Sequence, residues 1–379
     1  MLRHDAYDVV IVGGGVAGCC TALSLLQLDD QITILIIDRK GNEQLGTSIR
    51  VGETLPPQAS ARLQELNLWK RFQRINFHRS YGTAAVWGSD EIYHNEFIAS
   101  PYGYGWHVDR QVFDKMMIDA VLDKDIEYIF NASVTDLSIT NSVWTIDLKK
   151  GGSNYSVSSK FVVDATGKKA SIATRFGSNK IKSDHLIGII RAYTAENNQL
   201  AGSGAVVEAV PEGWWYSSRL NEGTTVTCLM TDADISKTKK LLDEIEFQKS
   251  LESTNYTFQR VGKPISELKI KAAHTQILDN IVGDGWLAVG DSASSFDPLS
   301  ALGVFKAMNL SKIASFAIKD YLMTNPLGLK RYEKVVKQNF QSYLDKKNEY
   351  YCEEKRFKGF PFWDRRNSVE METSSLMSK

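Results

Sequence analysis

A glycine-rich turn close to the start of the 379-residue chain restricts the fold more than any other feature of the sequence. An apolar run over residues 8–12 leads into Gly13-x-Gly15-x-x-Gly18, and an apolar helical segment follows it. The first glycine permits a tight turn, the second lets the backbone approach a diphosphate, and the third lets helix and strand pack closely. The pattern predicts a βαβ unit that binds a dinucleotide at the N-terminus of its helix.

A second apolar run, residues 31–37, ends at Asp38 and Arg39. A carboxylate at the end of this strand is placed to accept hydrogen bonds from the ribose hydroxyl groups of an adenine dinucleotide. The order of strand, glycine triplet, helix, strand and acid is more specific than the triplet alone. The alternative interpretation is a glycine-rich turn in an α/β domain that binds no nucleotide.

Composition excludes several classes of function. Hydrophobic residues make up 43% and charged residues 24% of the chain, and the formal net charge is +0. These values are ordinary for a soluble globular protein and give no indication of a nucleic-acid or membrane-surface partner. The four cysteines lack metal-ligand spacing, so we expect no metal and a reducing, cytoplasmic compartment. The early first strand leaves no room for a signal peptide, and no apolar run approaches the ~20 residues that span a bilayer.

The rest of the chain alternates between helical and β-rich segments. Two further apolar strands, over residues 160–167 and 285–291, end in glycine turns like the first, and Asp109 is an expected helix N-cap. Residues 77–87 are expected to form one strand and residues 90–104 a loop. Helical spacing covers residues 58–72, 111–122, 237–251, 302–322 and 329–355. An antiparallel sheet outside the dinucleotide domain is predicted from residues 186–195, 205–210, 214–219 and 224–231.

Three signatures stand together: the glycine triplet, Asp164-Ala165-Thr166-Gly167, and Gly290-Asp291 followed by Asp297-Pro298 and Gly303. As a set they resemble the FAD-dependent monooxygenases of the p-hydroxybenzoate hydroxylase fold, over roughly residues 5–320. The resemblance implies an α/β protein with a Rossmann-like FAD-binding domain of the glutathione reductase type, an inserted antiparallel β-sheet substrate domain and a helical C-terminal tail. The expected limits are 1–75, 104–178 and 270–325 for the FAD-binding domain, 76–103 and 179–269 for the substrate domain, and 326–379 for the helical segment.

The resemblance also implies roles for single residues. Gly290 and Asp291 would bind the ribityl chain and diphosphate of FAD, and the turn after Pro298 would present backbone N–H groups to the flavin. Arg110 resembles the arginine that approaches the diphosphate, although a surface salt bridge is the alternative. The residues expected to contact FAD are Gly13, Gly15, Val16, Ala17, Gly18, Asp38, Arg39, Gly52, Glu53, Arg110, Asp164, Gly167, Gly290, Asp291, Pro298 and Gly303.

Within that family, Val51-Gly52-Glu53-Thr54-Leu55-Pro56-Pro57 resembles the segment beside the flavin ring of tryptophan halogenases. Halogenases carry a lysine in a Ser-Tyr-Lys-like segment, whereas this chain has Ser80-Tyr81-Gly82. Their Trp-x-Trp motif is also changed at residues 214–217, and their flavin-proximal serine motif at residues 295–303. These departures favour oxygen-atom transfer through a flavin C4a-hydroperoxide, with aromatic halogenation as the second hypothesis.

Further motifs are similar to those of accessory flavoproteins that mature quinone cofactors by hydroxylating a Trp side chain in a protein. They are Gly-Glu-x-Leu-Pro-Pro, Ser80-Tyr81-Gly82 with Trp87-Gly88, residues 297–300, and the segment from Phe362 to Arg366. The implied substrate is an indole or phenol, either a small molecule or a Trp or Tyr borne by a peptide or protein. The electron donor is NAD(P)H or a separate flavin reductase. A non-catalytic flavoprotein that acts as a chaperone for an oxidase precursor is a third hypothesis.

The substrate pocket is expected between the flavin and the β-rich insertion. A histidine is the natural base for a proton released from an aromatic ring, so His107 and His78 are the catalytic candidates, together with Tyr81. Either histidine also has a purely structural interpretation. Tryptophans can stack against an indole, and the alternative for each is packing in the core. The tryptophans expected to contact the substrate are Trp87, Trp214, Trp215 and Trp363.

Overall fold

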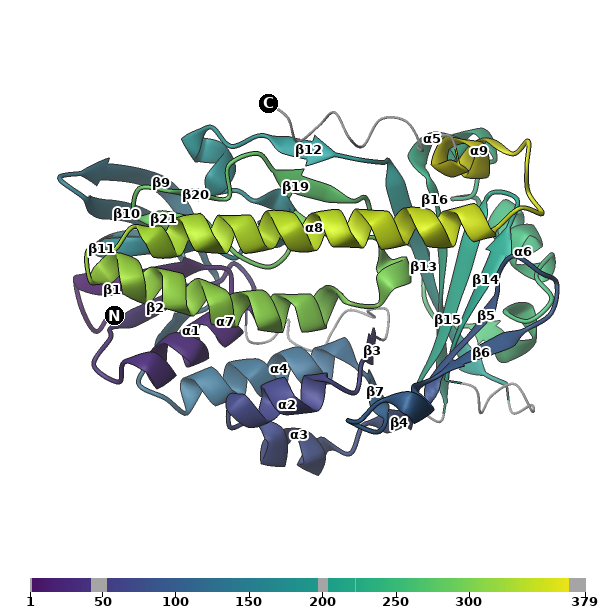
Figure 1. Ribbon diagram of the computed structural model, residues 1–379, viewed down its shortest axis with the longest axis horizontal. Coiled ribbons are helices and arrows are strands. Elements are labelled where there is room, and N and C mark those ends of the chain that lie inside the picture. The colour runs from purple at the N-terminus through teal and green to yellow at the C-terminus, as the bar shows by residue number, and fades with distance from the viewer. Residues whose placement is uncertain (1, 42–52, 197–203, 222, 368–379) are drawn as a thin grey trace.

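The computed structural model describes residues 2–41, 53–196, 204–221 and 223–367. Two large sheets lie at opposite ends of an elongated molecule, and the long C-terminal helix α8 (Leu327–Glu353) runs along both of them (Figure 1). No helix among these residues is long and apolar enough to cross a membrane. The α/β class, the inserted β-rich part and the helical tail are confirmed, while the exact domain limits stay a prediction.

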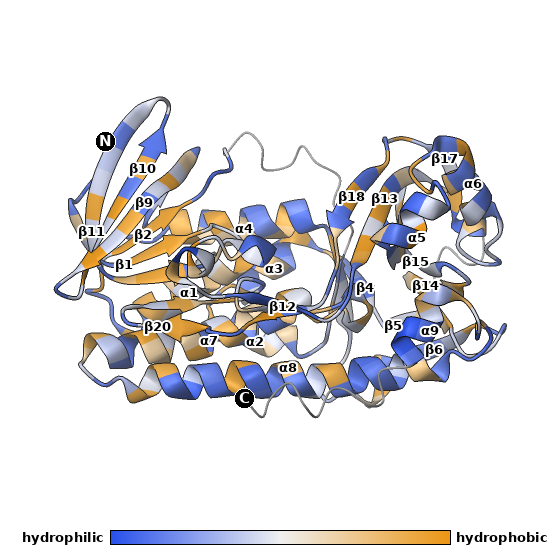
Figure 2. Ribbon diagram, turned by 90° about the horizontal axis from the view of Figure 1, so that it is seen from above, coloured by the Kyte–Doolittle hydropathy of each residue, from blue (hydrophilic) through white to orange (hydrophobic). Residues whose placement is uncertain are grey.

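The first sheet contains the predicted dinucleotide unit. Its main path runs β20-β21-β11-β1-β2-β8, and β1 pairs in parallel with both β2 and β11. The apolar colouring of β1 in Figure 2 agrees with its burial. A hairpin of β9 and β10 extends the N-terminal half of β11. The strands are β1 (Ala6–Val12), β2 (Ile34–Ile37), β8 (Glu127–Ile129), β9 (Ala132–Thr140), β10 (Val143–Lys150), β11 (Ser153–Asp164), β20 (Val282–Gly283) and β21 (Trp286–Ala288).

Helices flank this sheet, and most of them lie where helical spacing predicts. They are α1 (Val16–Leu28), α2 (Ala59–Glu65), α3 (Trp69–Ile75), α4 (Arg110–Leu122) and α7 (Gly303–Leu322). Asp109 caps α4, because its carboxylate accepts the backbone N–H groups of Gln111 and Val112. The single helix expected over residues 58–72 is broken, since Asn67 adopts a left-handed backbone conformation with φ of 59°.

The second sheet is the β-rich insertion. Its order is β17-β13-β16-β15-β14-β5-β6, with β18 also paired to β13. The four strands predicted to form an antiparallel sheet, β13 to β16, do pair in that way, and β5 extends the sheet by pairing with β14 in parallel. The strands are β5 (Gly82–Val86), β6 (Tyr93–Glu96), β13 (Leu186–Ala195), β14 (Ala205–Val210), β15 (Gly213–Asn221), β16 (Thr224–Asp232), β17 (Val261–Pro264) and β18 (Lys269–Ala272). Two helices cover it, α5 (Ala233–Thr238) and α6 (Glu244–Glu252), where one helix was expected over residues 237–251.

Two small sheets connect the large ones. The first contains β3 (Glu53–Leu55), β4 (His78–Ser80) and β7 (Gly105–Val108), and the second contains β12 (Lys180–Lys182), β19 (Gln276–Leu278) and β22 (Ser294–Ser295). The strand predicted over residues 77–87 is divided at Tyr81, because β4 pairs with β7 whereas β5 pairs with β14. Residues 90–104, expected as a loop, contribute β6 to the second sheet.

The C-terminal aromatic segment forms a short helix, α9 (Pro361–Asn367), that docks on the second sheet. The indole N–H of Trp363 donates to the carbonyl oxygen of Val210 at 2.8 Å. Both Arg366 and Asp232 are buried, and they form a two-pronged ion pair with N–O distances of 2.8 and 3.1 Å. This end of the chain is therefore integrated into the fold, and the helical tail joins the two large sheets.

Candidate functional site

The ends of four parallel strands lie side by side in the first sheet. Val12 of β1 is in register with Ile37 of β2 and with Asp164 of β11, and Asp164 is in register with Ala288 of β21. Backbone hydrogen bonds join the residues that follow, among them Gly13 N–H to Ile37 O at 2.8 Å. The carboxyl edge of such a sheet is where nucleotides bind in open α/β folds.

The glycine triplet has the geometry that a diphosphate site needs. A β-carbon at Gly13 would lie 2.2 Å from the carbonyl oxygen of Ala165, and one at Gly18 would lie 2.0 Å from the oxygen of Gly13. At Gly15 a β-carbon would meet nothing within 4 Å, and no side chain caps the helix there. The first and third glycines are thus required by packing, whereas the second leaves open space over the unpaired N–H groups of α1.

The third glycine loop meets the first. Gly290 has φ of 66°, and a β-carbon there would lie 2.6 Å from the β-carbon of Ala17. The hydroxyl of Ser311 on α7 donates to the carbonyl oxygen of Ala17 at 3.0 Å. Val16 is buried in the same turn. Segments almost three hundred residues apart in sequence therefore form one continuous surface, and this surface fits a dinucleotide.

Asp38 lies at the end of β2, where its carboxylate accepts the phenolic O–H of Tyr128 at 2.9 Å. Tyr128 stacks obliquely on Phe130, with ring centroids 4.3 Å apart. These two rings border the expected adenosine site, and sequence reasoning missed them because strand β8 carries no motif. Arg39, the next residue, is exposed.

Asp164 has a structural role. Its carboxylate accepts the backbone N–H and hydroxyl of Thr166 and the backbone N–H groups of Ile172 and Ala173, all within 2.7–2.9 Å. It is fully buried, so it shapes the loop instead of touching a cofactor. Gly167, with φ of 72°, lies in that loop and accepts the hydroxyl of Ser292. Asp164 was expected to contact FAD. In the structure its carboxylate instead holds the loop that contains Gly167.

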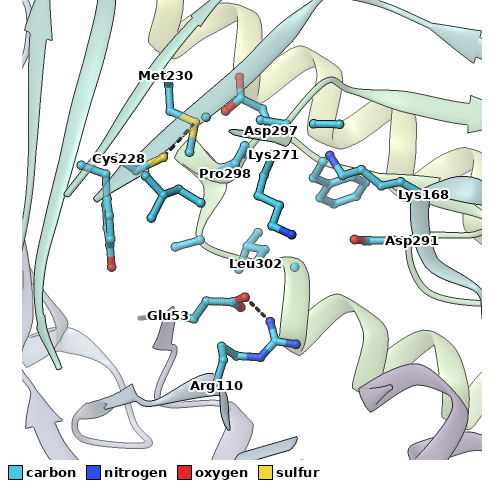
Figure 3. A pocket seen from close by; sticks show the side chains of 18 of the residues that line it. Glu53, Arg110, Lys168, Cys228, Met230, Lys271, Asp291, Asp297, Pro298 and Leu302 are labelled. Atoms are coloured by element: carbon cyan, nitrogen blue, oxygen red, sulfur yellow. Dashed lines mark hydrogen bonds and ion pairs between the residues drawn. The ribbon is translucent and has the colours of Figure 1, made fainter. Parts of the chain in front are cut away.

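A cavity of about 720 Å³ lies between the two large sheets, beyond the glycine loops (Figure 3). Glu53 and Arg110 form an ion pair at its floor, and Arg110 also contacts Asp114 at 3.2 Å. Burial raises the pKa of Glu53 despite the opposing charge of Arg110. Gly52 lies outside the described residues. Two carboxylates thus hold Arg110 at the cavity. It is not a free cation, and its ion pairs are not the simple surface salt bridge given as the alternative.

The turn that begins α7 forms the opposite side of the cavity. Pro298, Leu302 and Gly303 line it, and no side chain caps α7. Lys306, one turn along, is buried and contacts Asp291 at 3.1 Å, while its ammonium lies over the Phe296 ring. Burial opposes ionisation of Asp291, but Lys306 and Lys168 outweigh it and lower the pKa of that carboxyl group. The sequence analysis did not identify Lys306. Its position three residues after Gly303, in the first turn of the expected helix, was the available signal.

The second sheet provides an apolar wall above this turn. Ile190 of β13 pairs with Cys228 of β16, which pairs with Tyr216 of β15, and all three line the cavity. Met230 lies on the same face, with its sulfur 3.9 Å from that of Cys228. Because alternate residues of a strand face the same side, the wall is a continuous surface suited to a flat aromatic ring.

None of the three catalytic candidates lines this cavity. His107 is buried on β7, with Nδ1 3.3 Å from the hydroxyl of Thr54 and Nε2 against the backbone of Gly204. Burial, with a smaller effect from the positive charge of Arg260, lowers the pKa of His107 to about 4. His78 and Tyr81 are exposed. A neutral, enclosed His107 is suited to packing and hydrogen bonding.

The four tryptophans expected to contact substrate serve in packing. Trp87 lies edge-to-face against Trp363 and Trp214, with centroids 5.2 and 6.5 Å apart. Trp215 faces the other side of β15 and packs on Phe247. None of the four lines the cavity. Two residues further along β15 from Trp214, Tyr216 reaches it instead, because the side chains of alternate residues share a face.

The parallel strands at the centre of the first sheet, the converging glycine loops and the cavity at their end are features of a dinucleotide-binding enzyme, and a family model described as an FAD-dependent oxidoreductase matches residues 8–84. The chain belongs to the tryptophan halogenase family, whose model matches residues 90–378. The expected family and the FAD cofactor are confirmed. The chain is thus an FAD-dependent enzyme in a family of halogenases and monooxygenases with aromatic substrates.

Comparison with individual proteins agrees with this assignment. LodB of Marinomonas mediterranea, described provisionally as an FAD-dependent oxidoreductase, is 26% identical over 369 residues, which cover 96% of this chain and 98% of LodB. The myxobacterial chondrochloren halogenase CndH superposes with a TM-score of 0.88 at 18% identity, covering 97% of this chain and 87% of CndH. The peptidyl tryptophan dihydroxylase QhpG, essential for tryptophylquinone cofactor biogenesis, gives a TM-score of 0.71 at 19% identity, covering 96% of this chain and 79% of QhpG. At these identities the two solved structures establish the shared fold.

Proposed function

We propose that this enzyme is a monooxygenase that hydroxylates an electron-rich aromatic ring, namely a Trp side chain in a peptide or protein. The observation that carries the proposal is at position 82, where halogenases of the family have a lysine. Gly82 lies in the β5–β6 hairpin, and a β-carbon there would be 2.2 Å from the carbonyl oxygen of Asn95. The position therefore has no room for an amine-bearing side chain.

The residues of the chain would bind FAD and orient the substrate. The glycine turn and the N-terminus of α1 suit the diphosphate, Asp38 suits the ribose, and the Pro298–Gly303 turn suits the flavin ring. Bound reduced flavin supplies activated oxygen. The wall of Ile190, Cys228 and Met230 would hold an indole against that turn and keep water away from the reacting carbon.

The relationship to QhpG supports a peptide-borne substrate, because that protein acts on peptidyl tryptophan. Reducing equivalents would come from a separate flavin reductase or from NAD(P)H. Halogenation is the second candidate, and one observation favours it. The amine of Lys271 reaches into the cavity from β18 (Figure 3), so an amine from another strand is available there.

A single assay separates the two activities. The FAD-loaded enzyme is incubated with chemically reduced FAD, oxygen and a Trp-containing peptide, in the presence and absence of bromide. Hydroxylation adds one oxygen atom, about 16 mass units per turnover, and heavy-isotope dioxygen carries its label into the product. Bromide-dependent incorporation of bromine without the oxygen label would overturn the proposal in favour of halogenation.

A further inference from the structure

Two lysines border the apolar wall of the cavity. Lys269 and Lys271 lie on β18, where Lys269 is in register with Ile190 and Lys271 with Gly188 of β13. Gly188 is in turn opposite Met230 of β16. Because side chains in register on neighbouring strands point to the same face of a sheet, both amines share the face that lines the cavity. The wall is therefore apolar at its centre and cationic along β18.

The carboxylates that line the cavity are already engaged. Glu53 pairs with Arg110, Asp291 contacts Lys306, and the carboxylate of Asp297 accepts the phenolic O–H of Tyr351 at 2.7 Å. Within the described part of the chain, neither lysine of β18 forms an ion pair. Figure 3 shows Lys271 extended into the open space of the cavity.

This charge distribution has a chemical consequence. The lining contains three carboxylates and five cationic side chains, which are Lys40, Lys168, Lys269, Lys271 and Arg110. Lys40, Lys269 and Lys271 are exposed to solvent, and such a cluster of positive charge attracts anions with a strength that falls as salt is added. A purely apolar indole would use the wall alone and leave the two lysines of β18 without a counter-charge.

We propose, on the basis of the monooxygenase function above, that the substrate carries carboxylate groups close to its aromatic ring. The ring packs on Ile190 and Met230, and the carboxylates pair with Lys269 and Lys271. Such carboxylates come either from acidic residues near the aromatic residue of a peptide or from a free aromatic acid. Since residues two apart in an extended peptide point to the same side, acidic residues two positions before and after the tryptophan fit best.

Binding to the FAD-loaded enzyme is measured from the change in flavin absorbance, without turnover. The peptide probes are Ac-Glu-Gly-Trp-Gly-Glu-amide and its Gln-for-Glu analogue, and the small-molecule probes are indole-3-acetate and its neutral isostere indole-3-acetamide. The double variant Lys269→Met, Lys271→Met removes both amines and keeps the aliphatic length. Lys263→Met is the matched control, because Lys263 is an exposed lysine on the adjacent edge strand β17 that does not line the cavity.

We expect at least one acidic probe to bind about three- to tenfold more tightly than its neutral partner, with the preference declining as salt is added. The double variant loses the preference, and Lys263→Met keeps it. Whether the peptide or the small acid shows the larger preference identifies the source of the carboxylate.

Three results would overturn the proposal. The first is equal binding, or no binding, of charged and neutral probes. The second is a preference that persists in the double variant. The third is an equal loss of FAD affinity in that variant, which would assign the lysines to the cofactor. The binding measurement does not depend on product formation. Its outcome can therefore be interpreted even if the enzyme does not hydroxylate these probes.

Discussion

The phenolic oxygen of Tyr351 lies 2.7 Å from Oδ2 of Asp297 and donates a hydrogen bond to it. Tyr351 belongs to the C-terminal helix α8, whereas Asp297 begins the turn that faces the cavity. Trp214 of the second sheet donates to the same phenolic oxygen at 2.9 Å, and Tyr343 of α8 accepts the backbone N–H of Asp297 at 2.6 Å. Helix α8 thus connects the turn before α7 to the second sheet, which forms one wall of the cavity.

Replacing Tyr351 by Phe should loosen this turn. The substitution removes one hydrogen bond to the buried carboxylate of Asp297, so we expect the free energy of unfolding to fall by about 1–3 kcal/mol and FAD to bind more weakly. Denaturant unfolding and FAD titration measure the two effects. The neighbouring Tyr350 is half-exposed, and Tyr350→Phe should change neither. Equal stability and equal FAD affinity of the two variants would show that the hydrogen bond from Tyr351 to Asp297 does not position the turn.

The glycine triplet allows packing to be separated from cofactor binding. Gly15→Asp places a carboxylate in open space at the N-terminus of α1, where it is a favourable cap, but it repels a diphosphate. We expect unchanged or higher stability without FAD and a loss of FAD affinity of about tenfold or more. Gly13→Ala should destabilise the protein itself, because its β-carbon would collide with Ala165. Normal FAD binding by Gly15→Asp would contradict the assigned site.

Lys306→Met should expose the role of the ion pair with Asp291. The variant removes the cation that contacts this carboxylate and leaves Lys168 in place, so we expect the pKa of Asp291 to rise. We expect a loss of about 1–3 kcal/mol in unfolding free energy, smaller than for a fully buried pair because Asp291 opens onto the cavity, together with weaker FAD binding. The comparison variant is Lys312→Met on the same helix, whose exposed pair with Glu65 should contribute less than about 1 kcal/mol. A similar loss in both variants would argue against a special role for Lys306.

His107 should make stability depend on pH. Its pKa is about 4 in the folded protein against an ordinary value of 6.5, so the unfolded chain binds the proton more readily. Between those values stability rises with pH, and acidification should remove about 3 kcal/mol that is present above pH 6.5. His107→Asn should show a correspondingly smaller loss in unfolding experiments from pH 6.5 to 4. The exposed neighbour His78 provides the control: His78→Asn should keep the steep dependence, and no difference between the variants would refute the assignment.

Features encoded in contiguous residues were predictable. The strand–glycine–helix order around Gly13 follows from local sterics, and the strands β13 to β16 follow from sequences that alternate or are rich in β-forming residues. The N-cap at Asp109 was also readable, because its carboxylate acts on the very next residues. The break at Tyr81 was not, since it depends on β4 and β5 pairing with different distant strands.

The fate of the aromatic residues was the least predictable. Trp214 and Tyr216 are equally suited to a pocket by chemistry, yet the first packs under α9 and the second lines the cavity. Their difference depends on the docking of Trp363 and Tyr351, more than a hundred residues away. Likewise, nothing near Asp164 in the sequence reveals that four donors occupy its carboxylate.

By itself, the sequence determined the dinucleotide fold, the cofactor class and the positions of three glycine turns at the ends of strands. Turn geometry and glycine sterics act over a few adjacent residues, which a linear pattern records. Only the tertiary structure decided which side chains line the cavity: Lys269 and Lys271 line it, whereas the four tryptophans pack elsewhere. Which side chains line the cavity depends on sheet register and on helix docking. Both result from contacts between segments that are distant in the sequence.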